Sequence, residues 1–434
     1  MDCSASPSVV ARPQSDVSAG VGLVGLAVLV AWVMVCRSWP MVAAALDLGG
    51  PREPLAGPYA AVLALALSSG AMALWSVLVD KVHRRVSTGI DWAHPRPLRD
   101  VLGISAVKLV GLWATWAVIG TAYCVFRFYW QEPWLFGIRL IGLGVVPMAL
   151  LSVPYVLWLD RVLIDPRDGA WHCGAWVLGR DGADGGQLLL HTRRWAVKGF
   201  FTAFMFSILP GGFAAVVHVD GAALGDPVVL VNWLITWLFM IDVQIGTAGY
   251  LFTLRPLDAH IRNANPYLDG WVAALVCYPP FIMMGGNGPL DYHPGTAEWS
   301  QWLAGHEWAL WGWGAWLVAL TGVYAWATVV FGLRFSNLTY RGVITHGPYR
   351  LTRHPAYVSK NLFWWSVTLP FLSPTGSLVD CIRNTAILAM VSAVYWWRAK
   401  TEERHLLAQD AKYRQYWAWA ETGAPITRLL KRIV

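Results

Sequence analysis

The chain has 434 residues, of which 56% are hydrophobic and 14% charged, and its mean hydropathy is +0.46. This composition excludes a soluble globular enzyme and indicates an all-α, polytopic bundle of transmembrane helices. The net charge of +7 is accounted for by basic loops that orient the chain, so no nucleic-acid partner is indicated. The six cysteines lack ligand spacing, and we expect neither a disulfide framework nor a metal site.

Ten apolar runs are long enough, or nearly long enough, to span a membrane. An even number of spans would put both ends of the chain on one side. An alternative interpretation of residues 1–45 is a cleaved signal peptide, although the apolar run is long and its leader carries little positive charge. The ten runs lie at about 20–38, 56–79, 102–126, 135–159, 199–219, 228–252, 270–285, 308–331, 356–373 and 382–397.

Lysine and arginine are distributed unevenly between the two sets of connecting loops. One set, which includes both polar clusters described below, carries most of these residues. Because cytoplasmic loops are enriched in lysine and arginine, we expect this set and both termini to lie in the cytoplasm, with the protein in the cell (inner) membrane. The opposite loops hold only Arg37, Arg52, Arg127 and Arg383, with Arg139 just inside a segment.

A long loop at 161–197 marks the expected division of the chain. Residues 1–197 would form an N-terminal membrane module with four segments and unknown role, and residues 198–434 a C-terminal module with its core at about 308–434. Within the loop, the stretches 175–178 and 187–191 flank a glycine-rich turn, which predicts either a short hairpin or a plain ordered loop.

Two apolar runs contain polar or helix-breaking residues. The seventh run is broken by Tyr278-Pro279-Pro280, which predicts a bent or re-entrant helix whose freed backbone groups are covered by protein or line a cavity. Asp242 and Gln244 lie inside the sixth run, where they would either hydrogen-bond a neighbouring helix, the simpler interpretation, or contact a substrate.

Residues 334–365 crowd four arginines, two histidines, a lysine and three tyrosines in front of the ninth run. Such charge beside a membrane segment is costly unless it holds a ligand. Pro355 suits the first position of a helix, so the free N–H groups near His354, reinforced by Arg353, would form an anion site. Tyr357, one turn further, offers its hydroxyl. Snorkelling charges and interface aromatics are the alternative for each residue alone.

A second polar cluster follows the tenth run. Arg398 and Glu402 are four residues apart on one expected helix and can therefore pair, and Glu403 stands beside them. A carboxylate here would neutralise the basic cluster, hold a cationic ligand, or fix an arginine that binds an acidic substrate. The apolar side chains between Leu406 and Trp417 predict a helix that packs back over the site as a lid, or an amphipathic surface helix.

These clusters resemble the isoprenylcysteine carboxyl methyltransferase and phospholipid methyltransferase families of integral membrane enzymes, and more distantly the sterol reductases. The resemblance covers about the last 130 residues. It implies S-adenosylmethionine as cofactor and a lipophilic acceptor, with a carboxylate, amine or similar group, that is methylated at the cytoplasmic membrane face. It rests on Gly332-Leu333-Arg334-Phe335-Ser336, the run from His346 to Tyr357, and Glu402-Glu403 with Leu406, Tyr413 and Tyr416.

The resemblance also implies roles for individual residues. Arg398 and Glu402 would be the catalytic pair that orients the substrate group. Ser359 stands where the family often has glycine, and Ala408-Gln409-Asp410 replaces a common Phe-Gly, which leaves the shape of the substrate open. The cofactor would be contacted by Tyr349, Arg353, His354, Pro355, Tyr357, Glu402 and Glu403.

Two rival functions fit the same residues. One is an NADPH-dependent, sterol-reductase-like enzyme that reduces a lipid double bond, with Arg341 and Arg350 holding the 2′-phosphate. The other is a non-catalytic membrane protein that retains the pocket. The identity of the acceptor, the oligomeric state and the role of residues 1–200 do not follow from the sequence.

Overall fold

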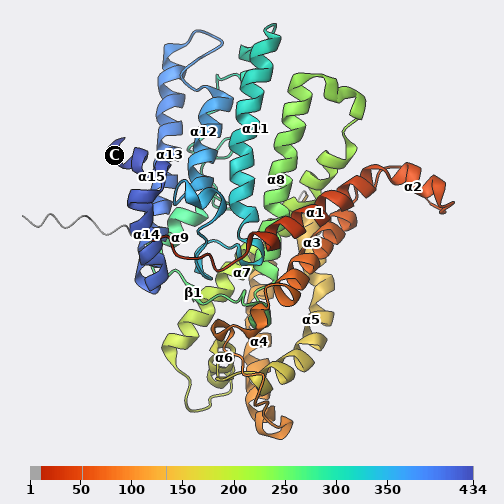
Figure 1. The fold of residues 1–434 in the computed structure, drawn as a ribbon, viewed down its shortest axis with the longest axis vertical. Helices are drawn as coiled ribbons and strands as arrows, with labels where there is room; N and C mark the ends of the chain where they lie inside the picture. The colour runs from red at the N-terminus through yellow and green to blue at the C-terminus, as the bar shows by residue number, and fades with distance from the viewer. Residues whose placement is uncertain (1–10, 51, 133, 434) are drawn as a thin grey trace, which may run out of the picture.

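The computed structural model describes residues 11–50, 52–132 and 134–433, which form fifteen α-helices and one short antiparallel sheet (Figure 1). The sheet pairs β1 (Asn263–Ala264) with β2 (Thr339–Tyr340). The helices are α1 (Ala19–Arg37), α2 (Trp39–Ala45), α3 (Pro58–Leu78), α4 (Leu98–Phe126), α5 (Leu135–Val162), α6 (Gly169–Val177), α7 (Gly185–His218), α8 (Pro227–Leu251), α9 (Leu268–Leu275), α10 (Trp299–Trp302), α11 (Glu307–Val329), α12 (Pro355–Thr368), α13 (Leu378–Gln409), α14 (Ala411–Gly423) and α15 (Pro425–Ile433).

The polytopic, all-α fold class is confirmed. Among the described residues, seven helices are long and apolar enough to cross a membrane, namely α1, α3, α4, α5, α7, α8 and α13. The expected number of about ten is therefore approximate. Of the other three runs, α11 has 23 residues but is rich in tryptophan, whereas α12 and α9 have only 14 and 8 residues. The protein is an integral membrane protein.

The seventh apolar run is short and irregular, as its proline pair predicts. Helix α9 ends at Leu275, and the chain then continues without regular structure to α10. This irregular stretch reaches the second turn of α13, where Asn384 donates to the carbonyl oxygen of Pro294 at 2.8 Å. The chain thus passes from one end of the bundle to the other through a crossing that is only partly helical, because the proline pair cannot continue the helix.

Helix α4 packs against the first half of α7, and α5 and α8 pack against its second half. Figure 1 shows α4, α5 and α6 below the level of α9, and α8, α11, α12 and α13 largely above it. Ser207 of α7 donates to the carbonyl oxygen of Trp134 at 2.9 Å, and the Tyr129 hydroxyl donates to that of Pro279 at 3.4 Å. The loop at 127–134, expected on the face of Arg37 and Arg383, therefore lies beside the broken seventh run.

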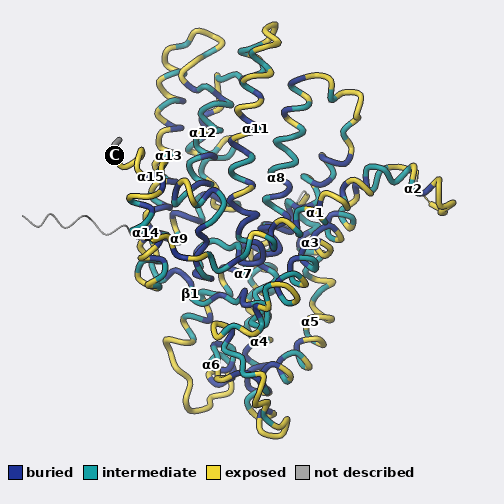
Figure 2. The backbone as a smooth tube through the Cα atoms, viewed as in Figure 1, coloured by how far each residue is buried: buried dark blue, intermediate teal, exposed yellow. Residues whose placement is uncertain are grey.

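The outer surfaces of the long helices are apolar. Leu143, Val146 and Leu150 of α5 are each more than 60% exposed. Figure 2 shows that buried residues concentrate in the middle of the molecule, where α7, α9 and the segment before α12 meet. Exposed leucine and valine on a membrane helix are suited to contact with lipid.

The loop expected at 161–197 is mostly helical, so neither the hairpin nor the plain loop is present. Residues 175–178 belong largely to α6 and residues 187–191 to α7. Helix α7 starts early because Asp184 caps it, accepting a hydrogen bond from the Gln187 amide at 2.7 Å. The proposed division of the chain after residue 197 falls inside α7, and the separate module remains a proposal.

The positions of the two ends of α13 lead to a prediction about which loops share one side of the membrane. We expect a tag near Gly182 and a tag after Val434 on one side of the membrane, and a tag near Gly295 on the other. The reason is that Gly295 lies beside Asp380 at the start of α13, whereas the C-terminal helices follow the far end of α13. Protease protection in sealed vesicles measures this, and finding Gly295 on the side of the C-terminus would contradict it.

Candidate functional site

The two polar clusters meet at one cavity of about 180 Å³. Its walls come from the chain after α9, from α11, from residues 334–349, and from α12, α13 and α14. Helices α9, α12, α13 and α14 lie together in Figure 1. The polar and aromatic lining includes Tyr278, Asn337, Tyr349, Tyr357, Arg398, Glu402, Tyr413 and Tyr416.

Arg398 lies in the wall of this cavity and is only 2% exposed. Its Nε lies 3.3 Å from Glu402 Oε1, and its Nη2 donates to Asn337 Oδ1 at 2.6 Å. The guanidinium lies between two rings, 5.3 Å from the centroid of Tyr278 and 5.2 Å from that of Tyr357. Ion pair, hydrogen bonds and aromatic faces together hold the charge in one orientation inside the protein.

Glu402 joins α13 to the first turn of α12. Its Oε1 accepts a hydrogen bond from the Tyr357 hydroxyl at 2.5 Å. The Tyr357 ring stacks on His354, with centroids 5.7 Å apart and an interplanar angle of 8°. Within the described chain Glu402 Oε2 accepts no hydrogen bond, and this oxygen is the one left for a ligand.

Arg353 and His354 are fixed by Glu403, the neighbour of Glu402. Glu403 Oε1 lies 2.9 Å from Arg353 Nε and 2.9 Å from His354 Nε2. Arg353 also pairs with Glu421 of α14, and its guanidinium lies 4.9 Å from the Trp417 ring centroid. These contacts fasten α14 across the start of α12, in the position expected of a lid.

The structure divides the residues predicted from the sequence into two groups. Pro355 starts α12 and Glu403 lies behind His354, and neither is part of the cavity lining. Both are placed to position their neighbours. The residues that line the cavity are Tyr349, Arg353, His354, Tyr357, Arg398 and Glu402.

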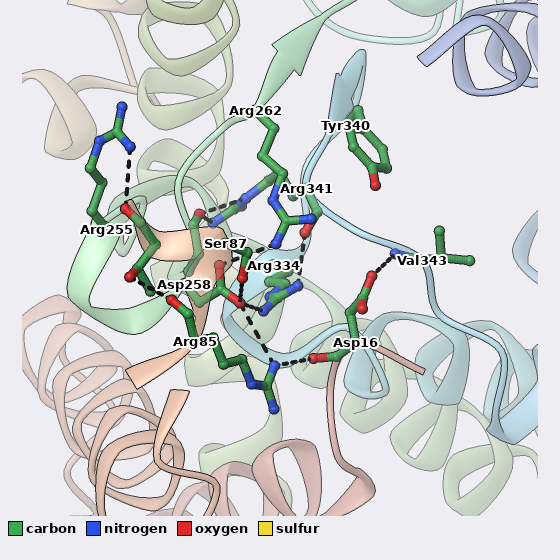
Figure 3. A network of polar contacts seen from close by, with 12 residues as sticks. Asp16, Arg85, Ser87, Arg255, Asp258, Arg262, Arg334, Tyr340, Arg341 and Val343 are labelled. Atoms are coloured by element: carbon green, nitrogen blue, oxygen red, sulfur yellow. Dashed lines mark hydrogen bonds and ion pairs between the residues drawn. The ribbon is translucent and has the colours of Figure 1, made fainter. Parts of the chain in front are cut away.

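A buried charge network supports the wall formed by residues 334–344 (Figure 3). At its centre is Asp258, which is 1% exposed and accepts hydrogen bonds from Arg334 at 2.7 Å, Arg262 at 3.1 Å and Ser87 at 2.8 Å. A buried carboxylate with several charged donors is stabilised only while those donors remain. The network thus ties the loop after α8 to the cavity wall and to the chain that follows α3.

Arg341 supports the same wall through backbone carbonyl groups. It donates to the carbonyl oxygens of Gly249, Leu333 and Phe335 at 2.7, 2.7 and 2.9 Å, and to that of Ala259 at 2.8 Å. The side chain is 3% exposed. Its donors are therefore engaged in holding the backbone together and are not free for a ligand.

Residues 11–18, which we call the N-terminal strap, close the wall from the other side. The Asp16 N–H donates to the Val343 carbonyl oxygen at 2.9 Å, and the Val343 N–H donates to the Asp16 carboxylate at 2.7 Å. Asp16 also pairs with Lys412 of α14. Arg12 lies 5.4 Å from the Trp419 ring centroid. Burial raises the pKa of Asp16, but the hydrogen bonds from Lys412 and Val343 outweigh it and lower the pKa below 3.8, so the carboxylate is charged at neutral pH.

Several cavity residues were not found from the sequence as parts of a site. Asn337 holds Arg398, and its only sequence signal is its place directly after the Arg334-Phe335-Ser336 motif. Tyr278 belongs to the proline break, whose freed backbone groups were expected either to be covered by protein or to line a cavity, and its side chain lines the cavity. Asp242 accepts from Tyr324 at 2.8 Å and from Thr328, which confirms the interpretation that it bonds a neighbouring helix, while Gln244 donates to the carbonyl oxygen of Ala61 at 3.3 Å.

Comparison with known proteins finds a similarity for part of the cavity wall. Residues 309–410, from the start of α11 to the N-cap of α14, match the model of the phospholipid methyltransferase family. The matched segment is thus similar to membrane methyltransferases of that family. No curated protein and no solved structure matches the chain. The match includes Arg398, Glu402 and the start of α12, supports a membrane methyltransferase that acts on lipid, and does not cover residues 1–308 or 411–434.

Proposed function

We propose that the chain is an S-adenosylmethionine-dependent integral membrane methyltransferase for a lipophilic acceptor. The observation that carries this proposal is the pair of buried Arg398 and half-buried Glu402, held by Tyr357 and Asn337 in a cavity wall that the family-matched segment largely forms. Bound S-adenosylmethionine supplies an activated methyl group on a positively charged sulfur. The protein has to align this group with the acceptor in a pocket that excludes water.

The residues of the cavity suit such a ligand chemically. Glu402 presents a free carboxylate oxygen, and the rings of Tyr349, Tyr413 and Tyr416 offer faces that attract a cation. His405 also lines the cavity, and its buried Nε2 has no hydrogen-bond partner within the described chain. A buried polar atom of this kind favours a site that a polar ligand completes.

We assign Arg398 to the acceptor. Its guanidinium would hold an acidic group of the acceptor, and Glu402 would keep the guanidinium in place. A carboxylate acceptor loses no proton during methyl transfer, so the protein then needs no general base. With an amine or hydroxyl acceptor, Glu402 or His354 would take the proton. His354 is already oriented by its contact with Glu403.

The reductase interpretation is less well supported by the same geometry. Its two candidate phosphate ligands are Arg341, whose donors are engaged with backbone carbonyl groups, and Arg350, which is exposed and outside the cavity lining. The ion pair between Arg398 and Glu402 likewise argues against a non-catalytic protein that merely keeps the pocket. From the charge asymmetry we further propose that the cavity opens to the cytoplasmic face of the cell membrane.

The decisive measurement is a titration of purified, detergent-solubilised protein with S-adenosylmethionine and with NADPH. We expect S-adenosylmethionine to bind with a dissociation constant on the order of 1 μM, about −8 kcal/mol, and S-adenosylhomocysteine to compete. Glu402→Gln removes the free carboxylate and should weaken this binding. Saturable NADPH binding without S-adenosylmethionine binding would replace the proposal by the reductase.

A further inference from the structure

Lys360 is a cavity-lining residue that neither the predicted site nor the proposed catalytic pair uses. It lies on α12, three residues beyond Tyr357. Its ammonium lies over three aromatic rings, 5.2 Å from the centroid of Tyr324, 5.3 Å from Trp364 and 5.8 Å from Tyr395. Across the described chain it makes no hydrogen bond and has no carboxylate within 4.0 Å.

The nearby carboxylates already have other partners. Asp242 accepts hydrogen bonds from Tyr324 and Thr328. Glu402 accepts from Tyr357 and pairs with Arg398. The Lys360 ammonium therefore faces the cavity with its three donors unused, although aromatic faces stabilise its charge.

An unpaired ammonium in a membrane helix is costly, and such residues mark places where a ligand or ion is handled. Aromatic faces offset part of this cost but accept no strong hydrogen bonds. A negatively charged ligand oxygen would both pair with the ammonium charge and accept its hydrogen bonds. Tyr395 lies between Lys360 and the ring of Tyr357, 5.7 Å from the latter, so Lys360 and Arg398 flank one stretch of the cavity.

We propose that Lys360 is a specificity-determining residue that binds the anionic group, a carboxylate or phosphate, of an acidic lipid acceptor. This inference rests on the proposed methyltransferase function and narrows its substrate to acidic lipids. The S-adenosylmethionine end of the cavity is then the one near Tyr349, Tyr413 and Tyr416, and the acceptor end is the one near Tyr324 and Lys360. Lys360 orients the lipid and takes no part in bond making.

The test is a binding assay without cofactor. Purified protein is titrated with three radiolabelled amphiphiles of equal chain length, namely a fatty carboxylate, an alkyl phosphate and a fatty alcohol. Lys360→Met should weaken at least one anionic probe by about tenfold or more, as expected for a lost charge-assisted hydrogen bond, and leave the alcohol unchanged. Lys360→Arg should retain most of the binding. The probe that is lost distinguishes a carboxylate from a phosphate acceptor.

Lys81→Met is the matched control, because it removes the same charge from an exposed loop after α3 and should change nothing. Unchanged binding of both anionic probes by Lys360→Met, or equal loss of all three probes, overturns the proposal. S-adenosylmethionine binding is measured on the same samples and should survive in Lys360→Met. Wild-type protein that binds acidic probes through Lys360 but does not bind S-adenosylmethionine would refute the proposed function alone.

Discussion

Replacing Arg398 by alanine is expected to lower methyl transfer by about 30- to 1000-fold while the protein stays folded. Arg398 is the only arginine of α13 that contacts Asn337, Tyr278 and Glu402 together. Losing a charge-assisted contact in a dry site costs roughly 2–4 kcal/mol of transition-state stabilisation. Arg398→Lys should recover little, because one ammonium cannot replace the planar fork between these partners.

Transfer is measured as label carried from S-adenosylmethionine into the lipid extract of membranes that contain each variant. Arg404→Ala is the control, since it removes an equal charge from the outer side of the same helix, where the side chain is 48% exposed. Glu402→Ala should reduce transfer comparably, and the double variant should be little worse than either single one, because paired residues act as a unit. If Arg398→Ala transferred methyl groups as fast as the wild type, Arg398 would have only a structural role.

Replacing Asp258 by alanine is expected to destabilise the fold by about 3–5 kcal/mol, because it leaves buried Arg334 without its carboxylate. The thermal midpoint in detergent should fall, and S-adenosylmethionine should restore part of it if the cavity wall depends on this network. Asp258→Asn keeps the backbone conformation, which has φ near 49°, and should cost less.

Arg85→Ala is the control for this network. Arg85 lies 3.7 Å from the same carboxylate but its side chain is 36% exposed, so about 1 kcal/mol or less is expected. Equal midpoints for Asp258→Ala and the wild type would show that the network around Asp258 is not what holds residues 334–344 in place.

The sequence was most informative where chemistry and local spacing coincide. The four-residue spacing of Arg398 and Glu402 predicted a pair, and the atoms lie 3.3 Å apart. The proline pair after Tyr278 predicted the broken segment. These features depend on one helix turn or on one residue type, and neighbouring residues are enough to decide them.

Features that depend on packing between distant segments could not be predicted in this way. Asn337 and Tyr278 reach Arg398 only because α9 and the chain before α12 fold against α13. No role for Lys360 followed from the sequence, because its isolation from carboxylates is a property of three helices together. Hydropathy and charge give the order of the spans but not how far one helix pair is displaced along another.

The N-terminal strap also sets the order in which the protein is completed during synthesis. The strap is synthesised long before Val343 and Lys412, with which Asp16 pairs. Until then the N-terminal strap has to stay on the side of the membrane where α14 will appear. If the cavity opens to the cytoplasm, as proposed, a secretion signal fused ahead of residue 11 would carry the strap to the opposite side of the membrane, and the cavity would remain open however well each helix had inserted.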